Sequence, residues 1–213
     1  LKSWPYLPLI DGDKVVNTNV TGEEQAKLTT WYTERSVAFI EKHHERPFFL
    51  YLPQTMPHVP LFVSDKQKGK SAQGLYGDVI QEIDWSVGEI TATLERLGLT
   101  ENTLVIFTSD NGGLATLEGM PFAPTFNAPL REGKGYLYEG GVRVPCVMKW
   151  PAEIKPGAVA NDVACSIDFF DTILRATERG AKELPDEPDG PKRDGWSLVA
   201  TFHGEKMKDR ELY

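Results

Sequence analysis

The most constraining feature of the sequence is a short apolar run that ends in a polar turn. Residues 104–107 are Leu-Val-Ile-Phe, a composition typical of a strand that is buried on both faces. Residues 110–113 are Asp-Asn-Gly-Gly, which cannot continue a strand and favour a sharp turn. Open α/β sheets bind ligands at the carboxyl ends of their strands, so this stretch predicts a central strand followed by a candidate site.

The acid–amide pair in this turn has two interpretations. Asp110 and Asn111 offer a carboxylate and an amide carbonyl, which are hard oxygen donors suited to Ca²⁺ or Mg²⁺. The same residue types dominate ordinary β-turns, because their short polar side chains bond to nearby backbone groups. The pair alone leaves both interpretations open.

The surrounding segments alternate between helical and extended patterns. Residues 21–45 begin with a threonine and a glutamate at capping-box spacing, which predicts a helix. Residues 48–52, Phe-Phe-Leu-Tyr-Leu, predict a short buried strand, and the apolar periodicity of residues 79–97 predicts a second helix that ends at Gly98. This order implies parallel strands with crossover helices, so we predict an α/β fold with a mostly parallel sheet flanked by helices.

Two other loops carry candidate site residues. His58 lies in a proline-stiffened loop after the predicted strand 48–52. Because parallel strands end at one edge of a sheet, we expect His58 to approach Asp110 and Asn111. Lys134 lies between two glycines, which let the backbone bring its ammonium close to an anionic ligand. The alternative for both His58 and Lys134 is an ordinary solvated side chain in a surface loop.

Composition excludes some classes of function. The formal net charge is -8 and no basic cluster offsets it, which argues against a nucleic-acid binder. No apolar run reaches the length of a membrane span. Cys146 and Cys165 do not make a disulfide framework, and their apolar neighbours predict buried thiols. Residues 1–5 lack a methionine and a signal-peptide pattern, so the cellular compartment is not predicted from this sequence.

The last third of the chain contains three further predicted segments. Residues 142–151 have the composition of another buried strand. Residues 168–177 predict a helix with Asp168 as its N-cap or first-turn acid. Residues 180–195 are rich in proline, glycine and charge, which is typical of a linker, and a short helix is expected within 196–203.

Four segments in this order resemble type I sulfatases, the arylsulfatase-like members of the alkaline phosphatase superfamily. They are Pro-Phe-Phe-Leu-Tyr-Leu-Pro with Pro-His-Val-Pro at 47–60, Thr-Ser-Asp-Asn-Gly at 108–112, Gly-Lys-Gly with Tyr-Glu-Gly-Gly-Val-Arg-Val-Pro at 133–145, and Asp168 with its helix. The third block is the most specific. The resemblance covers nearly the whole chain and implies a partial alkaline-phosphatase-like fold.

The resemblance also implies a function and roles for the candidate residues. The activity would be the hydrolysis of sulfate monoesters, on a sulfated sugar or a sulfated small molecule. Asp110 and Asn111 would be two ligands of a Ca²⁺ ion, with Mg²⁺ as the alternative. His58 would hydrogen-bond the ester near its bridging oxygen, and Lys134 would contact the sulfate and offset charge on the leaving oxygen. Members of the family are usually periplasmic, secreted or lysosomal.

The chain departs from the family pattern in its nucleophile. No Cys-x-Pro-x-Arg segment, the source of the family's formylglycine, and no Asp-Asp pair occur in residues 1–213. We therefore expect 1–190 to be the C-terminal part of a catalytic domain, and 191–213 to be a linker and the start of a C-terminal subdomain. We expect this chain alone to be inactive and to self-associate through an exposed sheet edge. The alternatives are another phosphoester hydrolase of the superfamily and a non-catalytic sulfatase-like fragment.

Overall fold

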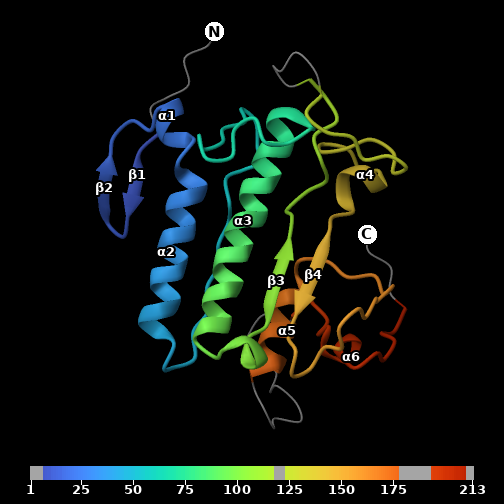
Figure 1. Ribbon diagram of the computed structural model, residues 1–213. Helices are drawn as coiled ribbons and strands as arrows, with labels where there is room; N and C mark the ends of the chain where they lie inside the picture. Colours follow the sequence, from blue (N-terminus) through green and yellow to red (C-terminus); the bar gives the residue numbers. More distant parts are fainter. Residues whose placement is uncertain (1–6, 118–122, 178–192, 210–213) are drawn as a thin grey trace. The chain divides into compact units, whose positions relative to one another are not determined.

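The computed structural model describes residues 7–117, 123–177 and 193–209, which form a mixed α/β structure (Figure 1). The chain divides into two compact units. The first comprises Leu1–Thr100 and Asn111–Val144, and the second comprises Glu101–Asp110 and Pro145–Tyr213. Most of the predicted linker 180–195 lies outside the described residues. No helix in the described ranges has the length and apolar character needed to cross a membrane.

Two long helices, α2 (Leu28–His43) and α3 (Gly74–Arg96), lie side by side in the first unit (Figure 1). The helix predicted over 21–45 consists of two helices, since a single turn, α1 (Gly22–Gln25), is separate from α2. The α2 residues Thr29, Thr33 and Ser36 are buried. Thr33 Oγ1 donates a hydrogen bond to Ser86 Oγ of α3 at 2.6 Å. Small hydroxyl side chains thus take part in the helix contact, and the apolar Leu28 and Ile40 of α2 are buried as well.

The α3 helix follows its predicted pattern closely. Val79 and Ile83 are buried and pack with Met56, Leu61 and Val63 in one hydrophobic cluster. The helix ends in a Schellman motif, in which Leu99 N–H donates to Leu94 O at 2.8 Å and Gly98 N–H donates to Glu95 O at 2.9 Å. Gly98 has φ +69, which other residues adopt only with strain, so its predicted role at the helix end is confirmed.

A buried carboxylate holds the loop that precedes α3. Asp78 is 3% exposed and accepts N–H bonds from Ser71 at 2.7 Å and from Gly69 at 2.8 Å. These two bonds lower the pKa of Asp78, the bond from Ser71 contributing most. The charged carboxylate therefore supplies the hydrogen-bond acceptors for backbone amides that lie outside any helix or strand.

The N-terminal residues form a hairpin that the sequence analysis does not predict. Strands β1 (Leu9–Asp11) and β2 (Lys14–Asn17) pair antiparallel, and Gly12 turns the chain with φ +60. The Asp-Gly pair at 11–12 is a known hairpin signal, but the strands are short and exposed. Arg35 of α2 forms an ion pair with Asp11 at 2.7 Å.

Residues 48–52 are extended but do not form the buried strand predicted for them. They have no β-ladder partner within the described residues. Phe49 is 68% exposed and Tyr51 is 76% exposed, while the alternate residues are half-buried. The apolar run is therefore buried on one face only.

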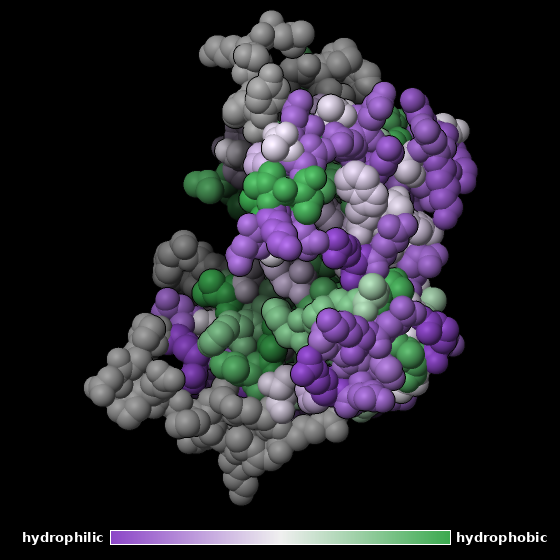
Figure 2. Space-filling view, turned by 90° about the vertical axis from the view of Figure 1, so that its left-hand side faces the viewer, coloured by the Kyte–Doolittle hydropathy of each residue, from purple (hydrophilic) through white to green (hydrophobic). Residues whose placement is uncertain are grey.

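Figure 2 shows one face of the molecule, on which apolar residues gather between polar ones.

The second unit contains strands β3 (Val105–Thr108) and β4 (Cys146–Lys149), which pair antiparallel with Thr108 opposite Cys146 (Figure 1). The prediction of a mostly parallel sheet is not confirmed, because both sheets within the described ranges are two-stranded and antiparallel. The prediction that residues 104–107 are buried on both faces is wrong, since Phe107 is 41% exposed. Cys146 is also exposed, contrary to its predicted burial. Composition indicates a strand but not its partner.

The predicted helix of the second unit is confirmed as α5 (Asp168–Thr177). Asp168 is fully buried at its first turn. Its Oδ2 accepts the Cys165 N–H and its Oδ1 accepts the Trp196 N–H, both at 2.8 Å. A helical turn, α6 (Val199–Phe202), packs Leu198 and Phe202 with Trp150 in a second hydrophobic cluster. Asp168 thus connects the helix start to the segment before α6.

We predict that Asp78→Asn weakens the loop before α3. The lowered pKa means that Asp78 stabilises the fold above the pKa of the unfolded chain, and that this contribution is lost as pH falls through the folded pKa, below the ordinary 3.8. Urea unfolding at neutral pH and in acid should show a less stable variant at neutral pH with a smaller loss on acidification. Asp84→Asn, at an exposed site on the same helix, is the matched control. Equal acid sensitivity of wild type and Asp78→Asn would contradict this account.

Candidate functional site

The structure brings together two of the predicted site residues. Lys134 Nζ lies 2.8 Å from His58 Nε2, although the residues are 76 positions apart. Both belong to the first unit. His58 is exposed and Lys134 is half-buried. The contact therefore forms at the surface, where a ligand from solvent can reach both side chains.

The hydrogen-bond partners of His58 assign its protonation. Its Nδ1 lies 2.7 Å from the carbonyl oxygen of Val59, which can only accept, so Nδ1 carries the proton. The Lys134 ammonium can only donate, so Nε2 accepts from it. His58 is thus neutral with its proton on Nδ1, and its lone pair on Nε2 holds the lysine.

In the part of the chain that the structure describes, no carboxylate pairs with the positive charge of Lys134. Within the described residues, its polar side-chain contact is the one with the neutral His58 ring. An ammonium carries three N–H donors, and His58 accepts from one of them. A half-buried cation that is oriented by a neutral ring and has further donors is suited to bind an anion.

The loop that carries Lys134 is held against the loop that follows Asn111. Lys134 N–H donates to Gly113 O at 3.0 Å. Gly133 packs so closely on Gly113 O that any β-carbon at Gly133 would overlap this oxygen. Gly135 has φ +91, which turns the chain directly after the lysine. The two glycines around Lys134 therefore serve a close backbone approach and a turn.

A second set of contacts closes the same loops further along the chain. Gly112 N–H donates to Gly141 O at 2.9 Å, at the single helical turn α4 (Glu139–Val142). Gly140 N–H donates to Arg131 O at 2.8 Å. A β-carbon at Gly112 would overlap the carbonyl oxygen of Gly140. The glycines of this block are thus needed because backbone packs directly on backbone.

The predicted metal ligands offer suitable chemistry but too few atoms. Asn111 is half-buried, and its Nδ2 donates to Gly112 O at 2.9 Å, so Oδ1 is the atom that would face a cation. Asp110 is exposed and ends the β3 segment of the second unit. No group of three or more acidic, histidine or cysteine side chains in the described ranges could hold a metal. Calcium takes six to eight oxygen ligands, so this pair is at most part of a site.

The environment of Cys146 does not activate its thiol as a nucleophile. Partial desolvation raises the pKa of the Cys146 thiol, which favours the unreactive protonated form. Cys165 is half-buried beside the first turn of α5, and its N–H is bonded to Asp168 at 2.8 Å. The raised pKa of Cys146 therefore argues against its use as a thiolate nucleophile.

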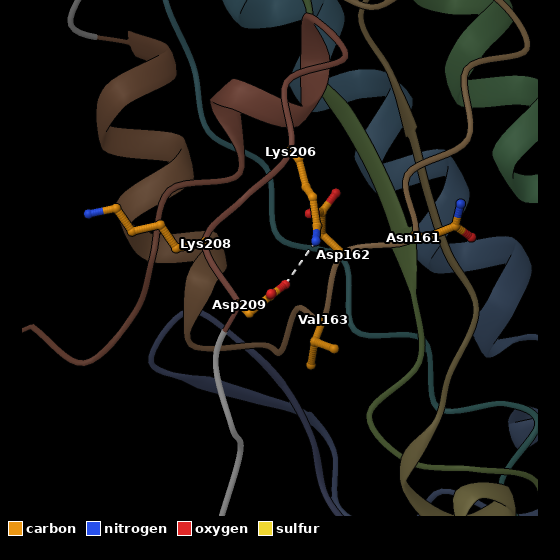
Figure 3. A pocket seen from close by; sticks show the side chains of 6 residues that line it. All are labelled: Asn161, Asp162, Val163, Lys206, Lys208 and Asp209. Atoms are coloured by element: carbon orange, nitrogen blue, oxygen red, sulfur yellow. Dashed lines mark ion pairs between the residues drawn. The ribbon is translucent and has the colours of Figure 1, made fainter.

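A shallow pocket in the second unit has a different character (Figure 3). It is lined by Asn161, Asp162, Val163, Lys206, Lys208 and Asp209. Lys206 forms an ion pair with Asp209 at 3.0 Å, and Asp162 Oδ1 accepts the Met207 N–H at 2.8 Å. Figure 3 shows Lys208 pointing away from this pair. The charges of Lys206 and Asp209 are therefore paired with each other, and Asp162 is engaged by a backbone amide.

One residue of the first unit was missed by the sequence analysis. Asn127 Oδ1 accepts the Gly113 N–H at 3.2 Å, and its Nδ2 donates to Gly113 O at 2.9 Å and to Glu132 O at 3.0 Å. Its neighbours, Phe126 and Ala128-Pro129, contain no pattern that distinguishes it from a turn asparagine. Its contacts become visible only when the two loops are in place.

Comparison with known proteins identifies the family. A family model described as Sulfatase matches residues 5–179. The N-acetylgalactosamine-6-sulfatase of Mus musculus is 39% identical over 195 residues, which are 91% of this chain and 36% of that protein. The steryl-sulfatase of Mus musculus is 39% identical over 189 residues, 87% of this chain and 29% of that protein. The chain thus spans about a third of the length of these curated relatives.

Solved structures agree with the sequence comparison. A sulfatase from a Pseudoalteromonas species matches with a TM-score of 0.79 and 31% identity, over 92% of this chain and 38% of that chain. A phosphonate monoester hydrolase from Silicibacter pomeroyi matches with a TM-score of 0.66 and 18% identity, over 99% of this chain and 49% of that chain. The second likeness shows a shared fold alone. Taken together, the family match, the relatives and the shared fold show that this chain belongs to the sulfatase family.

Proposed function

We propose that this chain supplies part of the active site of an enzyme that hydrolyses sulfate monoesters. The observation that carries the proposal is the 2.8 Å contact between Lys134 Nζ and His58 Nε2. It places at an accessible surface an ammonium that has no carboxylate partner among the described residues, which suits a sulfate group. Membership of the sulfatase family supports the same reaction class.

In this proposal Lys134 binds the sulfate and stabilises the leaving oxygen. When the sulfur–oxygen ester bond breaks, negative charge develops on the leaving oxygen, and a fixed ammonium nearby lowers the energy of that state. His58 in its Nδ1–H form accepts from Lys134 at Nε2. Its hydrogen bonding therefore favours a role in orienting the lysine over the role implied by the resemblance, a hydrogen bond to the ester near its bridging oxygen.

We also propose that Asp110 and Asn111 hold a Ca²⁺ ion, with Mg²⁺ as the alternative. Their carboxylate and amide oxygens fit a hard cation, and the remaining ligands would come from outside residues 1–213. Such an ion would supply positive charge toward the sulfate oxygens. The formylglycine nucleophile would likewise come from outside these residues, so the 213-residue chain alone should be inactive.

The proposed substrates are a sulfated sugar or a sulfated small molecule. The relatives include an N-acetylgalactosamine-6-sulfatase and a steryl-sulfatase, whose names are examples of these two classes. In the complete protein, residues 1–190 would belong to the catalytic domain and 191–213 would begin the next subdomain. The unpaired segment 48–52 would join a mostly parallel sheet there, and in the isolated chain it would favour self-association.

Activity of the complete gene product tests the function directly. We predict turnover of an aryl sulfate, with much slower turnover of the matching aryl phosphate and phosphonate. Lys134→Ala should lower kcat by about 100- to 1,000-fold, the usual effect of removing one group that stabilises transition-state charge. Lys70→Ala, at an exposed lysine of the same unit, should leave kcat unchanged. Full activity of Lys134→Ala, or turnover of the phosphonate alone, would overturn the proposal.

Calcium dependence tests the role of Asn111. We predict that a chelator lowers the melting temperature of the complete gene product, and that added Ca²⁺ restores it, because a ligand that binds only the folded state stabilises it. Asn111→Ala should need a higher Ca²⁺ concentration for the same rise, while Asn19→Ala, at an exposed asparagine of the first unit, should respond as wild type does. An unchanged calcium response in Asn111→Ala would remove Asn111 from the proposed site.

A further inference from the structure

Asn127 joins the two loops that carry the candidate site residues. It bonds both the N–H and the carbonyl of Gly113, which lies two residues after Asn111. Its Nδ2 also donates to the carbonyl of Glu132, which lies two residues before Lys134. One half-buried side chain thus spans the two loops at positions equidistant in sequence from their functional residues.

The chemistry of these bonds requires an asparagine. The amide donates twice and accepts once, so both N–H groups and the oxygen are engaged. An aspartate of the same size could accept from Gly113 N–H but would place a carboxylate against the carbonyl oxygens of Gly113 and Glu132. An alanine would leave all three backbone groups without this partner.

The backbone of Glu132 is strained. Among the described residues, Glu132 is the one non-glycine residue with positive φ, at +60. A bulky residue adopts this conformation only when its surroundings enforce it. The bond from Asn127 Nδ2 and the close packing of Gly140 against the same carbonyl oxygen both hold it. Asn127 therefore helps to fix the backbone conformation at Glu132, two residues before Lys134.

The backbone of Lys134 and the side chain of Asn127 share one acceptor, the carbonyl oxygen of Gly113. Lys134 N–H donates to Gly113 O, so the Gly113 peptide is bonded both to Asn127 and to the lysine backbone. Through this shared carbonyl, the orientation of the Asn127 amide is coupled to the position of the Lys134 backbone. A change at Asn127 would rotate the Gly113 peptide and move the lysine away from His58.

We propose that Asn127 is a positioning residue, which sets Lys134 and Asn111 at their working separation without touching the substrate. The inference rests on the proposed function for its catalytic consequence, but the structural link can be measured without any activity. Asn127 thereby preorganises the ammonium for an anion, and removing it should affect the chemical step more than substrate binding.

The link is tested in the 213-residue chain by amide hydrogen exchange and by ¹⁵N NMR of the His58 ring. In Asn127→Ala and Asn127→Asp, the Gly113 and Lys134 amides should exchange about tenfold faster, while α3 amides keep their protection. The wild-type ring should show the Nδ1–H tautomer, and both variants should show a tautomer mixture, as Lys134→Met should. Asn161→Asp and Asn161→Ala, at an exposed asparagine of the second unit, are the matched controls.

The catalytic consequence is tested in the complete gene product. Asn127→Ala should lower kcat by about 100-fold with a smaller change in KM, as expected for a misplaced catalytic group. Faster exchange with an unchanged His58 signal and unchanged kcat would show a purely structural role and overturn the proposal. Unchanged exchange in both variants would also overturn it. An inactive wild type together with the expected exchange and NMR changes would refute the sulfatase proposal and leave the link between the loops intact.

Discussion

The candidate site depends on the direct packing of two glycine-rich backbones. Residues 111–113 and 131–141 approach so closely that β-carbons at Gly112 and Gly133 would overlap carbonyl oxygens of the opposite loop. A β-carbon at Gly140 would overlap carbonyl oxygens within its own loop. This approach places Lys134 N–H on Gly113 O, and Gly112 N–H on Gly141 O. The ammonium that contacts His58 is therefore positioned by main-chain contacts, which vary little with side-chain motion. A loop built in this way suits a site that must present charge in one fixed direction.

In both units, polar side chains hold segments of irregular backbone by hydrogen bonds. Asp78 accepts amides of the loop before α3, Asp168 accepts amides on both sides of α5, and Asn127 joins the two site loops. Each is bonded to backbone groups that have no partner in a helix or strand. These side chains therefore supply hydrogen bonds that sheet ladders supply in regular structure.

The sequence predicts features that depend on nearby residues better than features that depend on distant ones. The end of α3 at Gly98 and the extent of α5 follow from local periodicity and capping, and both are confirmed. The orientation of β3 toward its partner depends on β4, some 40 residues away, and the parallel pairing expected for the sheet is not confirmed. Asn127 was missed because its role depends on hydrogen bonds to Gly113 and Glu132, which local sequence does not reveal. His58 and Lys134 were singled out by their loops and by the family resemblance, and the structure brings them together.

The central claim is that Lys134, held by neutral His58, receives a tetrahedral oxyanion. A crystal structure of the complete gene product soaked with selenate, whose selenium is located by anomalous scattering, tests this claim most directly. The account predicts selenate oxygens at hydrogen-bond distance from Lys134 Nζ, with His58 Nε2 still in contact with the same ammonium. Selenate bound elsewhere, with the lysine free in solvent or paired with a carboxylate, would contradict it.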